Sequence, residues 1–467
     1  MTPQSLLVQD VLASAQGRFS SENHIFYAFV EQALRMRLAQ QPLSVRGIIM
    51  TIQTWPRVIA LADMNAFFAS VEQVHNPDLM GKPIGITNGL TGTCIITSSY
   101  EARAFGVRTG MRVKEAKQLC PGFIQIPANP VLYAKVSTRI MDSLQDISPD
   151  IEIFSVDEAF LDLTKCKKVW NTTPEVIGMM IKRKIFSVSK VKCSVGISGD
   201  KSTAKWAAKL MKPDGLTIIP PWEAASRLRG VAVTELCGVN KGIGAFLAKR
   251  GAFTCGDVAR LPISVLGQRF GNPGKRIWYM CQGKDPDKVQ NNIKPPKSIG
   301  HGKVMPPNTK AKDTIYMYLV HMAEKVAQRL RKNALTAQRF YIGLKTRHGW
   351  LGNKFKIEFP SNDSKPIIEL CKIVMYRYWH GEGVHQVQLT ALDPREEKGQ
   401  VDLFEDDDIK HQQLNKALDN INERYGEFTL APANLLNRSD MPNVIAPAWK
   451  PYGHRQTIQD ANLLKKP

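Results

Sequence analysis

The sequence predicts an α+β protein with several domains, and three observations support this prediction. From Arg57 onward, strand-like apolar runs alternate with segments of helical periodicity. Over residues 231–290 the pattern changes to short helices separated by glycine turns. Between Lys294 and Lys356, basic residues are interleaved with further strand-like runs. With 467 residues, the chain also exceeds the length at which a single hydrophobic core stops growing, so we expect it to divide into domains.

The charge and the cysteines narrow the classes of function. The formal net charge is +21 at pH 7, which favours a polyanionic partner, either nucleic acid or an anionic membrane surface. The sequence has no apolar run of about eighteen residues and no secretory leader, so we expect a cytoplasmic protein without a membrane partner. The eight cysteines include no CxxC pair, which argues against a zinc site and against a disulfide framework.

The N-terminal region, residues 1–56, contains a predicted amphipathic helix. Its apolar residues recur at helical spacing after Ser20 and Ser21, which are candidate caps. These apolar residues are Phe26, Phe29, Val30, Ala33 and Met36. Two interpretations stay open: the segment is a docking helix, or it is an over-extended reading frame whose true start is Met50.

Acidic residues stand at the ends of strand-like runs. The run Val58–Ala62 ends at Asp63, and the run Phe154–Asp162 contains Asp157 and Glu158. Burying carboxylates among strand residues costs free energy unless nearby cations or hydrogen bonds compensate the lost hydration. Hard divalent cations such as Mg²⁺ take oxygen ligands and share them with substrate phosphates, so three such carboxylates in a basic protein indicate phosphoryl or nucleotidyl transfer. For the adjacent pair alone, the alternative is a solvated turn.

Strands and helices alternate along this part of the chain. A period of two marks the strands, and apolar spacings of three and four mark the helices. We expect strands at 82–87, 92–99 and 193–199, a hairpin at 151–164, and helices at 65–74, 100–107, 131–147, 175–189 and 202–212. Two helices packed on one face of a mixed sheet would complete an α+β layer.

Five runs occur in the order and at about the spacing that is typical of one enzyme family. They are LADMNAFFASVE, SSYEARAFGVRTGM, FSVDEAFLDLT, AKWAAKLMKPDG and KSIGHGK. They resemble motifs of the Y-family DNA polymerases, the translesion group, and the similarity extends from about Arg57 to Phe404. The resemblance implies a right-hand polymerase with a palm, small fingers, a helical thumb containing a helix-hairpin-helix motif, and a separate α/β little finger domain.

The resemblance also implies domain boundaries. The palm is expected in two parts, because the fingers are inserted into it. The expected ranges are 1–56 for the N-terminal helical extension, 57–80 and 131–230 for the palm, 81–130 for the fingers, 231–293 for the thumb, 294–400 for the little finger, and 401–467 for a clamp-binding motif with a C-terminal tail. In the tail we expect a helix at 411–426 and then a poorly ordered, proline-rich segment.

By this resemblance, the acidic residues form a catalytic metal site. Asp63, Asp157 and Glu158 are expected to hold two Mg²⁺ ions, with the backbone carbonyl of Met64 as a further ligand. One ion would activate the primer 3′-hydroxyl, and the other would hold the triphosphate of the incoming dNTP and the leaving pyrophosphate. The expected activity is template-directed, low-fidelity DNA synthesis across damaged bases.

Other residues of the same motifs are expected to bind the nucleotide. Phe68 matches the steric gate, a ring placed against the sugar C2′ so that a 2′-hydroxyl would clash. By periodicity alone, Phe68 would be a core residue of the helix after the first strand. The expected nucleotide-binding residues are Phe67, Phe68, Thr97, Tyr100, Arg103 and Lys212.

Two regions are expected to bind primer-template DNA. In the thumb, Gly238, Asn240 and Lys241 match a glycine turn that offers backbone N–H groups to a phosphate. Asn240 stands where the family has glycine, but Asn tolerates the left-handed conformation, so we expect the turn to persist; the alternative is a plain helix–helix turn. In the little finger, Lys294–Lys356 contains fourteen Lys or Arg residues and two acids, which predicts several phosphate contacts. The expected contacts there are Lys297, Ser298, His301 and Lys303.

The run QVDLF resembles the short peptide by which bacterial polymerases dock the sliding clamp. Gln400, Leu403 and Phe404 would make this contact, with the two apolar side chains in a pocket. The alternative is an acidic linker. By resemblance we expect a monomeric catalytic unit in the bacterial cytoplasm, associated with the nucleoid, and we leave open an additional mutagenesis accessory subunit as a partner.

Two other functions compete with this interpretation. One is a non-synthesising, DNA-binding mutagenesis accessory protein derived from the same family. Loss of the metal carboxylates would have favoured it, and all three are present. The other is a different palm enzyme, such as a cyclase, which the thumb, little finger and clamp motifs disfavour. We find no second acidic group in the sequence suited to a proofreading exonuclease.

Overall fold

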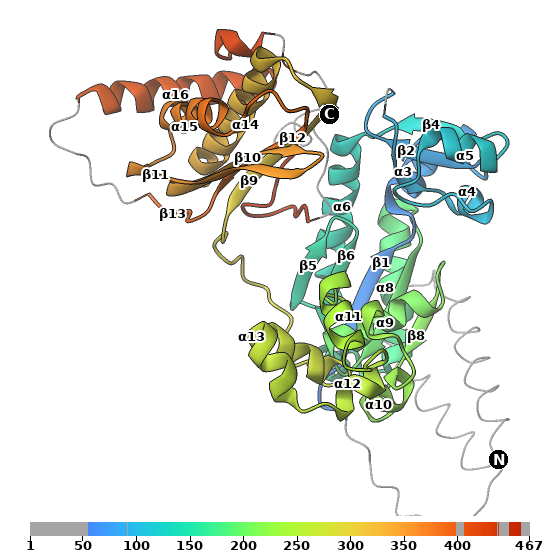
Figure 1. Cartoon of the computed structure of the whole chain (residues 1–467). Coiled ribbons are helices and arrows are strands. Elements are labelled where there is room, and N and C mark those ends of the chain that lie inside the picture. Colours follow the sequence, from blue (N-terminus) through green and yellow to red (C-terminus); the bar gives the residue numbers. More distant parts are fainter. Residues whose placement is uncertain (1–54, 91, 398–405, 437, 439–447, 459–467) are drawn as a thin grey trace, which may run out of the picture. The chain divides into compact units, whose positions relative to one another are not determined.

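The computed structural model describes residues 55–90, 92–397, 406–436, 438 and 448–458. The predicted N-terminal helix and the clamp motif lie outside these residues, so both stay predictions. Within the described part, the chain forms three sheets with helices packed against them (Figure 1). No helix in this part is both long enough and apolar enough to cross a bilayer.

A five-stranded mixed sheet, the palm sheet, contains the predicted acidic residues. Its strands are β1 (Ile59–Met64), β5 (Ile151–Ser155), β6 (Glu158–Asp162), β7 (Cys193–Ser198) and β8 (Leu216–Ile218). The strand order is β5-β6-β1-β7-β8, with β1 antiparallel to both neighbours and β7 parallel to β8. Every residue of β1 and β7 is buried, which explains why both strands are apolar on two faces. The hairpin predicted around the acidic pair is confirmed.

Helices cover both faces of the palm sheet. The helices of this region are α3 (Phe67–His75), α6 (Pro130–Leu144), α7 (Cys166–Trp170), α8 (Pro174–Ser189), α9 (Lys201–Leu210) and α10 (Pro221–Leu228). Ala60 and Ala62 of β1 belong to the same buried cluster as α6 and α8, whereas Ile59 and Leu61 belong to a cluster with α9. The two helices expected on one face are therefore present as α6 and α8. Since residues alternate along a strand, Asp63 lies on the α9 face.

The close approach of α9 to the sheet depends on Gly196 in β7. A Cβ at this position would lie 2.1 Å from the carbonyl oxygen of Ala204 and 2.3 Å from the backbone nitrogen of Ala208. Any side chain here would push α9 away. The glycine therefore allows lysines on and just after α9 to reach the ends of β1 and β6.

A three-stranded sheet with its own small core forms the region expected to be the fingers. Its strands have the order β3-β2-β4, in which β2 is antiparallel to β3 and parallel to β4. The core includes Ile95, Ala102, Val107 and Ala116. The elements are β2 (Ile84–Thr87), β3 (Ile95–Ser98), α4 (Tyr100–Ala104), α5 (Val113–Leu119) and β4 (Ile124–Pro127), and η2 (Pro77–Leu79) precedes them.

The region expected to be the thumb is helical and has a separate core. Its elements are η3 (Val233–Glu235), α11 (Lys241–Ala248), α12 (Cys255–Arg260) and α13 (Ile263–Met280). The expected turn before α11 is present, but Asn240 has a φ of −82° and is therefore not in the left-handed conformation. Gly238 takes that role with φ 91°. Asn240 instead caps α11, because its Oδ1 accepts a hydrogen bond of 2.9 Å from the backbone N–H of Ile243.

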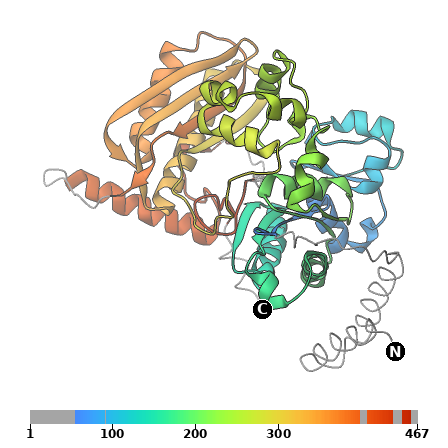
Figure 2. The ribbon, with the colours of Figure 1, turned by 90° about the horizontal axis from the view of Figure 1, so that it is seen from below.

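A five-stranded antiparallel sheet, the little-finger sheet, follows. Its elements are β9 (Ile299–Thr309), α14 (Lys312–Lys332), β10 (Leu335–Thr346), β11 (Gly349–Ser361), α15 (Ser364–Arg377), β12 (Val384–Ala391) and β13 (Arg395–Glu396). The strand order is β11-β10-β12-β9, and the short strand β13 pairs with one end of β10. Helices α14 and α15 pack on one face (Figures 1 and 2). Phe340, Ile342 and Leu344 of β10 are buried against these helices. The opposite face has no helix packed on it within the described residues.

The described C-terminal residues differ from the prediction in one respect. Helix α16 (Asp406–Tyr425) overlaps the predicted helix, and η4 (Ala433–Leu435) follows it. The expectation of a poorly ordered tail is wrong for residues 448–458, because Trp449 is fully buried and Ile458 is 8% exposed. The proline-rich composition of the tail concealed two large apolar side chains, whose burial offsets the entropy lost on ordering.

Candidate active site

The three predicted carboxylates lie at one end of the palm sheet. Asp63, near the end of β1, is the direct cross-strand partner of Glu158, the first residue of β6. Asp157 occupies the turn before β6, and its carbonyl oxygen accepts a hydrogen bond of 2.9 Å from the backbone N–H of Met64. Sheet pairing therefore brings together residues that are almost one hundred positions apart in the sequence.

Each carboxylate has a polar partner. Lys212 Nζ lies 2.5 Å from Asp63 Oδ1, and Lys205 of α9 forms an ion pair with Glu158 Oε2. Asp157 Oδ1 accepts a hydrogen bond of 2.7 Å from the hydroxyl of Ser155. The two ammonium groups thus compensate the negative charge at the strand ends, as a charge removed from water requires.

Burial dominates the electrostatics of this site. Desolvation raises the pKa of Asp63 to about 6; the Lys212 ammonium opposes this rise, and the charges of Glu158 and Asp157 add to it. Desolvation also raises the pKa of Asp157, against the hydrogen bond from Ser155. Bringing a cation to these oxygens would favour their ionised forms.

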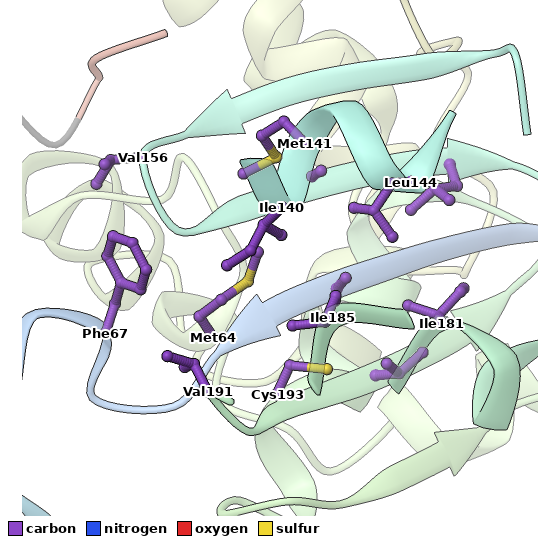
Figure 3. Close-up of a cluster of buried hydrophobic side chains, with 14 of the residues drawn as sticks. Met64, Phe67, Ile140, Met141, Leu144, Val156, Ile181, Ile185, Val191 and Cys193 are labelled. Carbon is purple, nitrogen blue, oxygen red and sulfur yellow. The ribbon is translucent and has the colours of Figure 1, made fainter. Parts of the chain in front are cut away.

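The candidate ligands are carboxylate oxygens, the type of donor that a hard divalent cation prefers. In this conformation, no three His, Cys, Asp or Glu side chains of the described residues converge closely enough to hold a metal ion. Lys205 and Lys212 occupy the space beside two of the carboxylates instead. Met64 can contribute only through its backbone, since its side chain is 1% exposed and points into the core beside Ile140 (Figure 3).

The two phenylalanines after the first strand have different environments. Phe68 is half-buried and stacks on Tyr133 of α6, with ring centroids 4.4 Å apart and planes 12° apart. Tyr133 is held in turn, because its hydroxyl donates a hydrogen bond of 2.6 Å to Glu72 Oε1. Phe67 is 3% exposed and belongs to the core (Figure 3). The expectation that the Phe67 ring binds the nucleotide is therefore not supported, whereas Phe68 is held in a fixed orientation.

The turn between β1 and α3 contains residues that the sequence analysis missed. Ala66 has φ 44° and ψ 48°, a left-handed conformation that is uncommon for a residue with a side chain. Asn65 holds the turn: its Nδ2 donates to Ser194 Oγ at 3.0 Å, and its Oδ1 accepts from the backbone N–H of Asp214 at 2.8 Å. Asn65 thereby joins the Asp63 turn to the loop that follows Lys212. The only signal in the sequence was its place inside a matched motif.

Residues of the fingers form a second part of the candidate site. The guanidinium of Arg103 lies 4.8 Å from the centre of the Tyr100 ring, and its Nε donates to the carbonyl of Ser98 at 3.1 Å. The Tyr100 hydroxyl is buried without a hydrogen-bond partner among the described residues. A buried hydroxyl without a partner is costly, so it indicates a ligand that would supply one. Thr97 is half-buried in β3 on the strand that leads to Tyr100.

The structure separates the four predicted DNA contacts of the little finger into two pairs. Lys297 and Ser298 are exposed before β9. His301 and Lys303 are spaced by two from the buried Ile299, so they lie on the face covered by helices. His301 contacts Arg329 of α14 at 3.3 Å, and burial lowers the pKa values of His301 and Lys303. Alternation along β9 therefore directs these two side chains away from the open side of the sheet, which does not favour them as DNA contacts.

The open face of the little-finger sheet carries other basic residues. We define the open face by three cross-strand pairs of β10 and β11 that alternate with the buried residues: Arg339 and Lys356, Tyr341 and Lys354, and Lys345 and Trp350. The ammonium group of Lys345 lies 5.4 Å from the centre of the Trp350 ring. The sequence showed that this segment is basic, but it did not identify these residues.

Comparisons with known proteins agree with this arrangement. Residues 62–209 match the impB/mucB/samB family, and residues 296–403 match the C-terminal domain of that family. The chain is 34% identical over 379 residues to a DNA polymerase IV of Moorella thermoacetica, covering 79% of this chain and 94% of the relative. It is 33% identical over 302 residues to a DNA polymerase IV of Methanoculleus marisnigri, covering 63% and 82%.

A solved structure shows the same fold. The Y-family DNA polymerase chimera Dbh-Dpo4(243-245)-Dbh superposes with a TM-score of 0.62 and 28% sequence identity, covering 72% of this chain and 98% of the chimera. The architecture is thus a right-hand polymerase with palm, fingers, thumb and little finger. Because the two family matches, the relatives and the fold agree, this chain belongs to the Y-family polymerases and is a DNA-directed DNA polymerase of translesion synthesis.

Proposed function

We propose that this polymerase transfers nucleotides with two Mg²⁺ ions held by Asp63, Asp157 and Glu158. The observation that supports this most is the desolvated pair of carboxylates at the strand end, where burial raises the pKa values of Asp63 and Asp157. Such carboxylates are stabilised by a cation, and oxygen ligands of this kind suit Mg²⁺. The ions, when bound, would activate the primer 3′-hydroxyl and neutralise charge on the triphosphate and the leaving pyrophosphate.

In this proposal, the two lysines change partners when substrate and metal bind. Lys212 leaves Asp63, which it contacts at 2.5 Å, and turns to the triphosphate. Lys205 stays beside Glu158 and keeps that carboxylate in place through their ion pair. The lysines therefore hold the carboxylates in place before catalysis, and a charged substrate provides the alternative partner.

Tyr100 and Arg103 bind the triphosphate in the same proposal. The buried Tyr100 hydroxyl needs a hydrogen-bond partner, and a phosphate oxygen would supply one. Arg103 is exposed, and no described carboxylate pairs with it. Its guanidinium is therefore available for a charge-assisted hydrogen bond to phosphate. Thr97, on the strand before them, is kept as a weaker contact.

Phe68 serves as the steric gate. Its ring is fixed by stacking on Tyr133, which is itself hydrogen bonded to Glu72. A rigid ring can exclude a 2′-hydroxyl, whereas a ring free to rotate would yield. The half-buried position leaves part of the ring exposed to a substrate.

The primer-template binds to the thumb turn and to the open face of the little-finger sheet. Gly238, Asn240 and Lys241 are exposed at the start of α11, where backbone N–H groups favour a phosphate. On the open face, basic side chains alternate with two aromatic rings, which suits a phosphate backbone. Lys297 and Ser298 extend this surface toward the linker.

Several further expectations remain part of the proposal. Leu403 and Phe404, with Gln400, dock a sliding clamp. The catalytic unit is a monomer associated with the bacterial nucleoid in the cytoplasm. The domain boundaries are those expected from the sequence, from the N-terminal region 1–56 to the tail 401–467.

A binding experiment tests the metal site. Binding of Mn²⁺ would be measured by electron paramagnetic resonance, with Mg²⁺ as competitor, for the wild type, Asp63→Asn and Glu158→Gln. We expect each variant to lose affinity for the ions while it retains primer-template binding, because the fold keeps its other contacts. Asp162→Asn is the matched control, since Asp162 lies at the opposite end of β6. Unchanged ion binding by Asp63→Asn and Glu158→Gln would contradict the proposal.

A further inference from the structure

Residues 448–458, which we call the C-terminal strap, lie beyond the part of the chain that matches the family's C-terminal domain, residues 296–403. Trp449 is fully buried and Ile458 is 8% exposed, and both belong to the main hydrophobic cluster of the palm. The hydroxyl of Tyr452 also donates a hydrogen bond of 2.5 Å to Asp142 of α6. The strap is therefore anchored to the palm at both ends and in the middle.

The same strap contacts the little finger and its linker. Arg329 of α14 donates a hydrogen bond of 3.1 Å from Nη2 to the carbonyl oxygen of His454. At Gly453, a Cβ would lie 2.7 Å from Cγ2 of Ile293, so the strap passes close to the linker before β9. One short segment thus touches the palm core, the linker and α14.

Arg329 makes the contact with α14 specific. Its other guanidinium contacts are Nη1 to the carbonyl of Gly300 at 3.2 Å and Nη1 to His301 Nε2 at 3.3 Å. Desolvation lowers the pKa of Arg329, and it forms no ion pair with a carboxylate among the described residues. A buried guanidinium needs acceptors, and the strap supplies one of the two carbonyl oxygens that it uses.

In its first part, the linker between thumb and little finger is fixed both to α13 of the thumb and to the palm. Asp285 accepts two hydrogen bonds from Arg276, and its carbonyl accepts one from Arg57. The backbone N–H of Gln290 donates to Glu152 Oε2 at 2.9 Å. From residue 292 to residue 295 the linker is exposed.

Besides the linker, the strap connects the palm to the little finger among the described residues. Among the described elements, none between Ile299 and Glu396 packs broadly against an element of the palm or thumb. The strap contacts the little finger on the side of α14, and the basic residues of the open face lie on the opposite side of the sheet. The strap therefore does not cover the surface proposed to bind DNA.

From these contacts we infer that the C-terminal strap holds the little finger at a defined position relative to the palm, and that this tie prepares the two domains to bind primer-template DNA together. A tethered but loose domain must be ordered when DNA binds, and this costs affinity. Because the strap already restricts the position of the little finger before DNA binds, a smaller part of the binding free energy is spent on ordering this domain. The effect on DNA binding rests on the proposed role of the open face.

The first test measures the domain positions directly. Spin labels at Phe186→Cys in the palm and Tyr376→Cys in the little finger, both exposed, would report the distance distribution in a background with the exposed Cys94 and Cys237 replaced by Ser. We expect Trp449→Ala, and a chain that ends at residue 447, to broaden this distribution. Leu436→Ala is the matched control, since Leu436 is 82% exposed in the same C-terminal region. An unchanged distribution in both strap variants would overturn the inference.

The second test measures affinity for a short primer-template. Release of the strap should weaken binding by roughly tenfold, the loss expected when binding has to order additional groups, while the extension rate at saturating DNA stays unchanged. Arg329→Gln removes the hydrogen bond to the strap but leaves Trp449 unchanged, so it tests the inference even if Trp449→Ala does not fold. This variant should show a smaller loss of affinity for the primer-template. Unchanged or tighter binding after release would overturn the inference. Charge reversal at Lys354 in both the intact and the released chain tests the DNA-binding face separately, because it should weaken binding in both.

Discussion

The palm sheet and the little-finger sheet both carry clusters of charged side chains, but these clusters differ in their exposure to solvent. At the end of β1 and β6, Asp63 is buried and Glu158 is half-buried, and Lys212 and Lys205 compensate their charges. On the open face, basic side chains such as Lys354 point into solvent. A buried charge interacts strongly over a short distance and is little affected by salt, whereas an exposed charge is screened. The first arrangement suits the fixed geometry of catalysis, and the second suits a sliding contact with DNA.

The largest effect is expected at the buried site. Asp157→Ala or Glu158→Ala should lower nucleotide incorporation by about 10³-fold or more, as loss of a group that stabilises transition-state charge does. Folding and primer-template affinity should be largely retained in Asp157→Ala, because this carboxylate is costly to bury. Glu158→Ala also removes the partner of the largely buried Lys205, so a lower free energy of unfolding is expected for this variant. Single-nucleotide incorporation on a primer-template measures the first quantity and fluorescence anisotropy the second. Near-normal incorporation would remove these residues from the active site.

A second prediction separates the two neighbouring phenylalanines. Phe68→Ala should raise ribonucleotide incorporation far more than it lowers deoxynucleotide incorporation, because it removes a clash that exists only with the 2′-hydroxyl. Phe67→Ala should instead lower the free energy of unfolding by about 3 to 5 kcal/mol, as for a buried aromatic ring. Competition between the two nucleotides and chemical denaturation measure these effects. If sugar selectivity stayed unchanged in Phe68→Ala, that residue would be only a stacking partner of Tyr133.

The third prediction tests whether the exposed charge behaves as a DNA-binding surface. Replacement of Lys345, Lys354 and Lys356 by Ala should reduce the log–log salt slope of primer-template binding by about 0.9 for each lost phosphate contact. Lys303→Ala is the matched control and should leave the slope unchanged, because Lys303 lies on the helix-covered face. Titrations at several salt concentrations give the slope. An effect of Lys303 equal to that of Lys354 would show that the assignment of faces is wrong.

The smallest effect on the isolated enzyme is expected from the clamp motif. Leu403→Ala with Phe404→Ala should abolish clamp-stimulated synthesis while basal synthesis on short primer-templates persists. The expected affinity loss is on the order of 3 to 6 kcal/mol, as for two large apolar side chains removed from a pocket. Binding of the wild-type and substituted peptides to purified clamp provides the measurement. Stimulation that survives in the full-length variant would mean that QVDLF is a linker.

The sequence alone determined much of the catalytic region. The continuous apolar run of β1 and the strand-like runs around the acidic pair predicted β1 and the hairpin of β5 and β6, and the acids in these runs by themselves indicated a metal site. These signals are local, since strand propensity and an acid after a strand are visible within a few residues. The matched motifs supplied Tyr100, Arg103 and Phe68, which periodicity alone would not have distinguished from helix or core residues.

Tertiary structure decided what depends on distant contacts. The pairing of Lys205 with Glu158 and of Lys212 with Asp63 requires α9 to lie close to β7, which Gly196 permits. Whether His301 and Lys303 faced DNA depended on the side of the sheet that α14 covers, because a shift of one residue reverses the face of every side chain in a strand. The burial of Trp449 against the palm depended on residues more than two hundred positions away. The local sequence of a proline-rich tail does not predict that Trp449 packs against the palm core, so only the tertiary structure shows this contact.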